Sequence, residues 1–179
     1  AYCHKIWPKS HIFRSAEHIF EEVMFNYKIG VRRFSFVDDI FNLNRENSRR
    51  FFQMIIDAKL DDIQLFYLMR GDILTEDYID LMIEAGVVRL GLALETGSPR
   101  MQKMIRKNLR LEKLRANIDY LATTYPEVIL ELYSMHGFPT ETEEEARMTM
   151  QFMKDTKWIH FPYIFILVVY PDTDMEKLA

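Results

Sequence analysis

The chain has 179 residues, of which 49% are hydrophobic and 13% aromatic, which is enough apolar material to bury the core of one domain. Its formal net charge of -4 gives no overall electrostatic reason to bind nucleic acid or an anionic membrane. The longest apolar run, 163–170, is far shorter than the roughly 20 residues that span a bilayer, and no signal-peptide pattern opens the chain. A single cysteine cannot form an internal disulfide, which agrees with a reducing compartment, so we expect a cytoplasmic protein.

Helical and strand patterns alternate along the first part of the chain. Ser15 is placed to cap a helix that Gly30 ends, and the segment VRRFSFV at 31–37 follows as a strand. A second helix is predicted over 45–58. The short apolar run IQLFYLM at 63–69 has the length of a strand.

The same alternation continues through the middle of the chain. A helix is predicted over 75–86 and a strand over 87–94. The pair Ser98-Pro99 is typical of a helix start, and a further helical stripe covers 111–121. The segment VILELYSM at 128–135 is the next predicted strand.

The last two elements are a helix and a strand. Thr140 and Glu143 have the spacing of a capping box, which predicts a helix over 140–156. We interpret the three glutamates at 143–145 as solvated charges that the helix dipole favours. The segment IFILVVY at 164–170 is predicted to be the last strand.

Five apolar strands that alternate with helices indicate an α/β fold with a parallel sheet buried on both faces. Five strands are too few for a closed eight-stranded barrel. The pattern leaves two alternatives, an open partial barrel and a doubly wound sheet, and both place ligands at the carboxyl ends of the strands.

Polar or turn-forming residues follow every predicted strand: Asp38 and Asp39, Arg70 and Asp72, Glu95 and Thr96, His136 and Gly137, Tyr170 and Pro171. Taken singly, most have an ordinary structural explanation. An aspartate pair commonly caps a turn. Arg70 and Asp72 could form a surface ion pair, which contributes little to stability. Glu95 is harder to explain in this way, because a carboxylate that continues a buried strand loses solvation unless it is paired.

Five motifs in order carry more information than any one residue: YC, FSFVDDIF, RLGLALETGSPRMQKMIRKN, HGFPTETEEE and VVYPDT. Together they resemble the radical S-adenosylmethionine (radical SAM) superfamily over essentially the whole chain. More narrowly, they resemble the branch with cobalamin-dependent members, in which an aspartate pair stands where other branches have Gly-Gly-Glu. The resemblance implies a partial (β/α)6 TIM-type barrel with parallel strands, and a single radical SAM core domain over 1–179 whose first strand precedes this chain.

The resemblance also gives the only cysteine a role. The family's loop is Cys-x3-Cys-x2-Cys with an aromatic residue before the last cysteine, so Tyr2 and Cys3 match the end of that loop and the second cysteine would directly precede Ala1. Three such thiolates hold a 4Fe-4S cluster and leave one iron open. In the family that iron binds S-adenosylmethionine, and an electron from the cluster cleaves it to methionine and a 5'-deoxyadenosyl radical. One thiolate does not hold such a cluster, so we expect this segment alone to be inactive.

The resemblance implies cofactor-binding roles for charged residues. Asp38 and Asp39 match the place that meets the methionine amino group of S-adenosylmethionine. Glu95 matches a residue that contacts the ribose hydroxyls or lies near the methionine moiety. Lys107 matches the basic residue that pairs with the methionine carboxylate, although lysine offers a point charge where arginine offers a fork.

One turn and two further side chains complete the expected site. Gly137, Phe138 and Pro139 match a turn whose backbone lines the adenine region in the family. Arg70 stands where some relatives carry a ribose-binding glutamate, and we keep it as a substrate-side candidate. His136 is the second substrate-side candidate.

The implied parent is an iron-sulfur enzyme that starts radical chemistry from S-adenosylmethionine, for methylation or rearrangement of an unactivated carbon with cobalamin as partner cofactor in the full-length protein. Its expected partners are a small-molecule or peptide substrate and a reductant such as flavodoxin or ferredoxin, with no nucleic acid at this domain. Two alternatives stay open: a methylthiotransferase-like or coproporphyrinogen-oxidase-like radical SAM enzyme, and a noncatalytic α/β binding module without the cluster. Cysteines at the two upstream positions would favour an enzyme.

Overall fold

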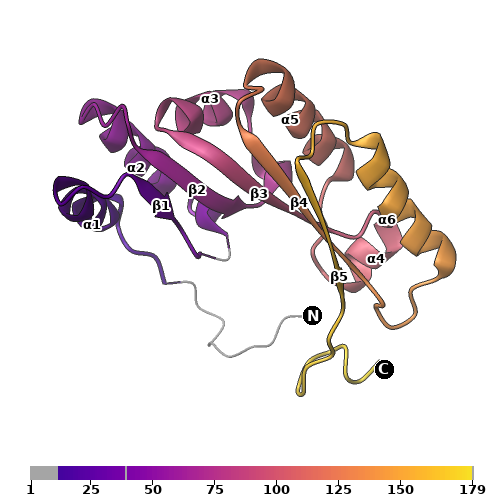
Figure 1. Ribbon diagram of the computed structural model, residues 1–179. Coiled ribbons are helices and arrows are strands. Elements are labelled where there is room, and N and C mark those ends of the chain that lie inside the picture. Colours follow the sequence, from indigo (N-terminus) through magenta and orange to yellow (C-terminus); the bar gives the residue numbers. More distant parts are fainter. Residues whose placement is uncertain (1–11, 39, 179) are drawn as a thin grey trace.

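The computed structural model describes residues 12–38 and 40–178, and its five strands form one parallel sheet in chain order. The strands are β1 (Arg33–Ser35), β2 (Gln64–Met69), β3 (Val87–Glu95), β4 (Ile129–His136) and β5 (Phe161–Ile166). The predicted α/β fold with five parallel strands is therefore confirmed. In Figure 1 the strands run toward the same edge of the sheet, and the helices lie along one of its faces. The expectation of a sheet buried on both faces is therefore wrong, because the helices cover one face and most of β5 is exposed.

Within the described residues, one α-helix precedes β1, and five further α-helices and two short 3-10 helices connect the strands. The α-helices are α1 (Ala16–Lys28), α2 (Arg45–Asp57), α3 (Glu76–Glu84), α4 (Pro99–Met104), α5 (Leu111–Thr124) and α6 (Glu143–Asp155). The 3-10 helices are η1 (Phe41–Leu43), directly after the β1 loop, and η2 (Gly71–Ile73), directly after β2. No helix in the described part of the chain is long and apolar enough to cross a membrane.

Local capping residues start two of the helices at the predicted places. The Ser15 side chain accepts a hydrogen bond from the His18 amide at the start of α1, at 3.2 Å. Ser98 does the same for the Met101 amide at the start of α4, at 3.2 Å, with Pro99 in the first turn. Each serine satisfies one amide that the first helical turn leaves without a partner.

The start of α6 was predicted two residues too early. The capping box consists of Thr142 and Glu145, not of Thr140 and Glu143. Both pairs have the same spacing in the sequence, but Thr140 has a φ of 65° and ends the preceding turn instead of starting a helix. The frame shift moves Glu145 into the capping position that faces the protein interior.

The last strand was also predicted too late in the chain. Strand β5 pairs with β4 from Phe161, opposite Glu131, to Ile166, opposite His136. The Leu167 amide makes the final bond to the His136 carbonyl at 2.8 Å. An apolar run becomes a strand only where a partner supplies hydrogen bonds, so the pairing with β4 sets both ends of β5.

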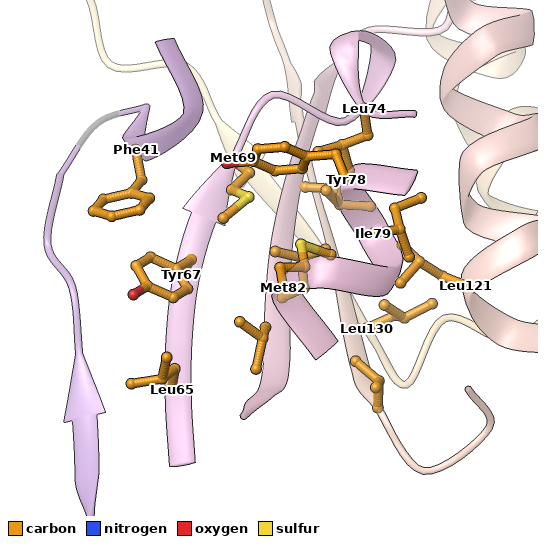
Figure 2. Packing of buried hydrophobic residues seen from close by; sticks show 14 of the residues in the cluster. Phe41, Leu65, Tyr67, Met69, Leu74, Tyr78, Ile79, Met82, Leu121 and Leu130 are labelled. Carbon is orange, nitrogen blue, oxygen red and sulfur yellow. The ribbon is translucent and has the colours of Figure 1, made fainter. Parts of the chain in front are cut away.

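The core lies between the helices and the sheet face that they cover. Phe52 of α2 packs edge-to-face on Tyr67 of β2, with ring centroids 5.6 Å apart, and both side chains are fully buried. Figure 2 shows Tyr67 with Leu65 on β2 and Leu121 of α5 farther along the same layer. Leu92 of β3 belongs to the same buried cluster. These contacts fix the positions of the strands relative to the helices.

Replacing Phe52 by alanine is expected to lower the free energy of unfolding by about 3–5 kcal/mol, because the removed ring leaves a cavity in a close-packed layer. Phe25 on α1 is 67% exposed, so Phe25→Ala is the matched control with an expected change within about 0.5 kcal/mol. Urea unfolding followed by circular dichroism measures both. Equal effects of the two substitutions would contradict the proposed core.

Candidate functional site

The carboxyl ends of the strands meet at one edge of the sheet, as they must when neighbouring strands are parallel. Four predicted site residues lie directly at or after these ends: Asp38 after β1, Arg70 after β2, Glu95 at the end of β3 and His136 at the end of β4. The predicted residues Tyr2, Cys3 and Asp39 lie outside the described residues. We call the loops at this edge the rim.

Glu95 and Lys107 form an ion pair at the rim. The Lys107 Nζ atom lies 2.7 Å from Glu95 Oε1, and the two side chains are only 14% and 11% exposed. Glu95 has a φ of 62°, which is a costly conformation for a glutamate, and the pairing of β3 with β4 shifts register just before it. Strain of this kind persists only where surrounding contacts enforce it, and it is common at functional sites.

Gln102 holds the end of β3 and the Lys107 loop together. Its side-chain amide nitrogen donates to the Leu94 and Thr96 carbonyls, at 2.8 and 2.7 Å. Its side-chain oxygen accepts from the Leu109 amide at 3.2 Å. Because Gln102 is buried, these bonds are shielded from water and keep Lys107 close to Glu95.

Arg70 supports the same loop from β2. Its guanidinium donates to both Asp72 carboxylate oxygens, at 2.7 and 3.2 Å, and to the Asn108 carbonyl at 3.2 Å. The interpretation as a weak surface pair is wrong, because the Asp72 side chain is 1% exposed. Burial raises the pKa of Asp72, but hydrogen bonds from Arg70 and from the Arg110 amide outweigh burial and leave that pKa below its usual value.

The turn after β4 contains Gly137, Phe138 and Pro139, and Gly137 has a φ of 82°, which favours glycine. The Glu141 carboxylate accepts from the Gly137 amide at 2.7 Å and from the Phe138 amide at 3.3 Å. Glu95 pairs with Ser134 across the sheet, three residues before Gly137 and thus about 10 Å along the strand. The turn and the ion pair therefore lie at the same edge of the sheet, at the ends of neighbouring strands.

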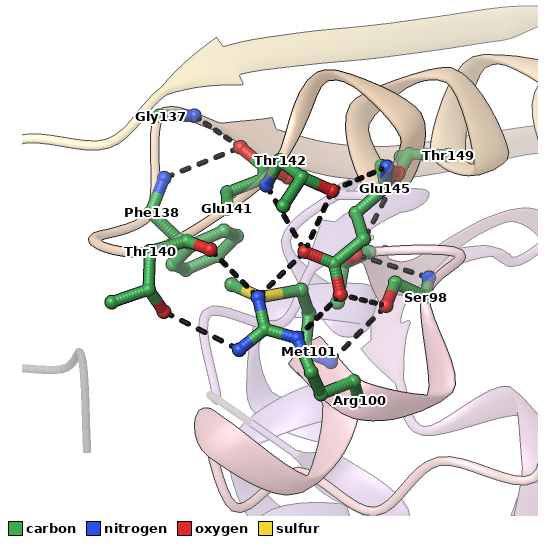
Figure 3. A network of polar contacts seen from close by, with 11 residues as sticks. Ser98, Arg100, Met101, Gly137, Phe138, Thr140, Glu141, Thr142, Glu145 and Thr149 are labelled. Carbon is green, nitrogen blue, oxygen red and sulfur yellow. Dashed lines mark hydrogen bonds and ion pairs between the residues drawn. The ribbon is translucent and has the colours of Figure 1, made fainter.

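A buried carboxylate fastens this turn to α4. Figure 3 shows Arg100 between Glu145 and Thr140: it donates to the two Glu145 oxygens at 2.7 and 2.6 Å and to the Thr140 carbonyl at 2.7 Å. Ser98 Oγ also donates to Glu145 at 2.9 Å. The interpretation of 143–145 as solvated charges is wrong for Glu145, which is buried. The Arg100 hydrogen bonds lower its pKa from 4.5 to about 2.

The loop after β3 also lies against α6. Gly97 donates its amide to Thr149 Oγ1 at 2.9 Å. A Cβ atom at Gly97 would meet the Met148 carbonyl oxygen at 2.8 Å and the Thr149 Cα at 2.9 Å, so only glycine allows this approach. The conformation of the segment that begins at Glu95 thus depends on α6.

His136 and Asp38 take different positions from the ion pair. Side-chain alternation puts His136 on the face of β4 that carries Leu132 and Ser134, which the helices cover. Its Nε2 atom is buried and has no hydrogen-bond partner among the described residues. Asp38 is exposed beyond the end of β1. Among the predicted site residues that the structure describes, Glu95 and Lys107 are the pair joined by an ion pair.

The sequence analysis missed a charged group on the sheet face opposite the helices. Glu131 of β4 is fully buried, accepts from Arg89 Nε at 2.9 Å and accepts from the Tyr133 hydroxyl at 2.6 Å. The stack of Tyr133 and Tyr163, with centroids 4.9 Å apart, lies beside it. The signal was present, since Glu131 interrupts an otherwise apolar strand and therefore required a partner.

No three His, Cys, Asp or Glu side chains in residues 12–38 and 40–178 form a group that could hold a metal ion. The thiolate ligand implied for Cys3 lies outside those residues, and its fit to a cluster stays a prediction. The rim of the described residues does carry one buried charge of each sign, Glu95 and Lys107, which pair with each other.

A sequence model of the Radical SAM superfamily matches residues 1–153. The chain belongs to this superfamily. It is 29% identical over 167 residues to the uncharacterized methyltransferase PH0819 of Pyrococcus horikoshii, covering 92% of this chain and 35% of that protein. It is 28% identical over 106 residues to a tRNA-2-methylthio-N(6)-dimethylallyladenosine synthase of Mycobacteroides abscessus, covering 58% of this chain and 21% of that protein.

A solved structure has the same fold. The radical S-adenosylmethionine methyltransferase TsrM from Kitasatospora setae, with cobalamin and a 4Fe-4S cluster bound, matches with a TM-score of 0.81 at 16% identity. The match covers 90% of this chain and 30% of TsrM. The radical SAM chain therefore has the partial TIM-type barrel fold, and it spans well under two thirds of each of these proteins.

Glu145→Gln is expected to lower the free energy of unfolding by about 2 kcal/mol at neutral pH, because the Arg100 guanidinium loses its charged partner. The depressed pKa of Glu145 means that its stabilisation is present above pH 4.5 and is lost as the pH falls toward about 2. The difference in the free energy of unfolding between wild type and Glu145→Gln should therefore become smaller over that pH range.

Urea unfolding at a series of pH values measures this difference. The exposed neighbour Glu144 offers the matched control, Glu144→Gln, with no resolved effect expected. If the difference in the free energy of unfolding between wild type and Glu145→Gln stays constant down to pH 2, the charge of Glu145 does not stabilise the fold.

Proposed function

We propose that this domain is the S-adenosylmethionine-binding core of a radical SAM enzyme that methylates or rearranges an unactivated carbon with cobalamin as partner cofactor. The observation that carries the proposal is the buried Glu95–Lys107 pair on the rim, in a chain that belongs to the Radical SAM superfamily. The cobalamin part draws support from the aspartate pair at 38 and 39 and from the fold shared with TsrM.

Each rim group would have a distinct task in binding S-adenosylmethionine. Lys107 would pair with the methionine carboxylate, and Asp38 with Asp39 would meet the methionine amino group. Glu95 would accept hydrogen bonds from the ribose hydroxyls or contact the methionine moiety. These charge-assisted bonds position the sulfonium group without taking part in its cleavage.

The bound cluster would supply the electron that cleaves S-adenosylmethionine, with Cys3 as one of its three thiolate ligands. The protein would contribute orientation and an environment that excludes water. A reductant such as flavodoxin or ferredoxin, a small-molecule or peptide substrate, and a cytoplasmic location belong to the same proposal.

A second candidate is a methylthiotransferase. The similarity to the synthase from Mycobacteroides abscessus favours it, although that match covers only 58% of this chain. A basic nucleic-acid-binding domain next to this one in the full-length protein would favour that candidate over cobalamin-dependent methylation. Both candidates use the same rim residues.

In the full-length parent, Glu95→Ala and Lys107→Ala are each expected to raise the KM for S-adenosylmethionine by roughly tenfold or more, because each removes a charge-assisted hydrogen bond of about 1.5–3 kcal/mol. The measurement is 5'-deoxyadenosine formation after anaerobic cluster reconstitution and reduction. Lys103→Ala, on the exposed side of α4, is the matched control.

Two results would contradict the proposal. A wild-type protein with an intact cluster that releases no 5'-deoxyadenosine is not a radical SAM enzyme. Unchanged kinetics in both rim variants would remove Glu95 and Lys107 from the S-adenosylmethionine site while leaving the activity in place.

A further inference from the structure

The loop after β1 packs on the side chain of Tyr67 in β2. Phe36 and Phe41 flank the aspartate pair at 38 and 39 in the sequence, and both rings contact the Tyr67 ring with centroid separations of 4.4 Å. The Phe36 and Phe41 rings also contact each other, with centroids 5.3 Å apart. One tyrosine ring therefore holds both ends of the segment that carries the aspartate pair.

The hydroxyl group of Tyr67 is not paired in this packing. Its oxygen is buried, the whole residue is 0% exposed, and the oxygen makes no hydrogen bond within residues 12–38 and 40–178. Burying a hydroxyl without a partner is costly, whereas a phenylalanine ring would fill the same space without that cost. A tyrosine here therefore indicates a partner that the hydroxyl meets when a ligand is bound.

The neighbouring polar groups favour Asp38 as that partner. Burial raises the pKa of Tyr67 well above its ordinary value, and the nearby Tyr78 and Asp38 add to the rise. The Tyr78 hydroxyl already donates to Ser48 Oγ at 2.7 Å, and burial raises its pKa to about 12, so it is neutral at physiological pH. Of these two neighbours, only Asp38 offers a charged acceptor.

The Tyr67 hydroxyl also points in the required direction. Figure 2 shows it on the side of the ring that faces β1 and the loop that follows β1. The two strands pair as far as Ser35 and Phe66, and the Phe36 amide adds a further bond to the Phe66 carbonyl at 3.0 Å. Asp38 follows two residues later, so the hydroxyl is aimed at the segment that carries this carboxylate.

A bound cation would favour the contact between this hydroxyl and Asp38. The Asp38 side chain is exposed, and moving a lone carboxylate from water against an apolar aromatic cluster costs solvation. An ammonium group paired with the carboxylate offsets part of that cost. A carboxylate has two oxygens, so it can accept from the ammonium group and from the tyrosine hydroxyl together.

We propose that Tyr67 is a positioning residue for the aspartate pair, and that its hydroxyl donates to the Asp38 carboxylate when the amino group of S-adenosylmethionine binds there. This inference rests on the proposed function, and it adds the residue that fixes the orientation of Asp38. Tyr67 itself does not touch the ligand. Because the ring is already held by Phe36, Phe41 and Phe52, the hydroxyl is pre-organised for this bond.

The first test removes only the hydroxyl, with the variant Tyr67→Phe. Because the hydroxyl is unpaired without ligand, we expect the urea midpoint of the ligand-free, full-length protein to stay unchanged or to rise. Binding of S-adenosylhomocysteine to the cluster-loaded protein, measured by isothermal titration calorimetry, should weaken by roughly tenfold, since a hydrogen bond to a charged group is lost.

Tyr78→Phe is the matched control in the same aromatic cluster, where Tyr78 packs on Phe52 with centroids 5.9 Å apart. This change removes a buried hydrogen bond to Ser48, so the urea midpoint should fall while the affinity for S-adenosylhomocysteine stays the same. A purely structural role of the Tyr67 hydroxyl would give Tyr67→Phe the same pattern as this control.

Two further measurements test whether Tyr67 acts through Asp38. The double variant Tyr67→Phe/Asp38→Asn should bind S-adenosylhomocysteine no more weakly than Asp38→Asn alone, because both changes remove the same interaction. The analogue of S-adenosylhomocysteine that lacks the amino group should bind wild type and Tyr67→Phe equally well.

The outcomes separate this inference from the proposed function. Wild type that binds no S-adenosylhomocysteine contradicts the proposed function itself. Unchanged affinity in Tyr67→Phe, an equal loss for the analogue without the amino group, or additive effects in the double variant overturns the role of Tyr67 and leaves the S-adenosylmethionine site in place. A Tyr67→Phe protein that does not fold also overturns it, because an unpaired hydroxyl is not needed for folding.

Discussion

Every strand of the sheet runs parallel to its neighbours, and this constraint decides where the polar side chains lie. Each strand must return through a helix on the covered face, so all carboxyl ends reach the same edge. Backbone amides and carbonyls in the loops at this edge lack the regular hydrogen bonds of a helix or a sheet, so they need side-chain partners. Glu95, Lys107 and the turn at Gly137 lie at the same edge of the sheet because of this constraint, although 42 positions separate the first from the last.

Buried side chains supply those missing bonds and make the rim rigid. Gln102 joins the end of β3 to the Lys107 loop, and Asp72 with Arg70 holds the same loop from β2. Glu145 ties α6 to α4 through Arg100. A rigid rim keeps a buried ion pair in one geometry, which is the condition under which charged groups orient a ligand well.

The sequence allowed the parallel sheet, the order of elements and the local caps at Ser15 and Ser98 to be predicted, because period and capping are local signals. It did not reveal that Glu145 is buried, since its partner Arg100 lies 45 positions away. The residues at which β5 begins and ends depend on its pairing with β4, which no local sequence pattern encodes. The family resemblance singled out Glu95 and Lys107, but only the structure shows that their side chains are in direct contact. The roles of all the predicted site residues stay predictions, and Tyr2, Cys3 and Asp39 lie outside the described residues.

We propose that the rim, and no other surface of this domain, binds S-adenosylmethionine. Hydrogen exchange of the cluster-loaded, full-length protein, measured by mass spectrometry with and without S-adenosylhomocysteine, tests it most directly. We predict that the ligand slows amide exchange in segments 93–98, 105–110 and 137–142. Slower exchange confined to other segments, or none in these three while the ligand is bound, would contradict the account.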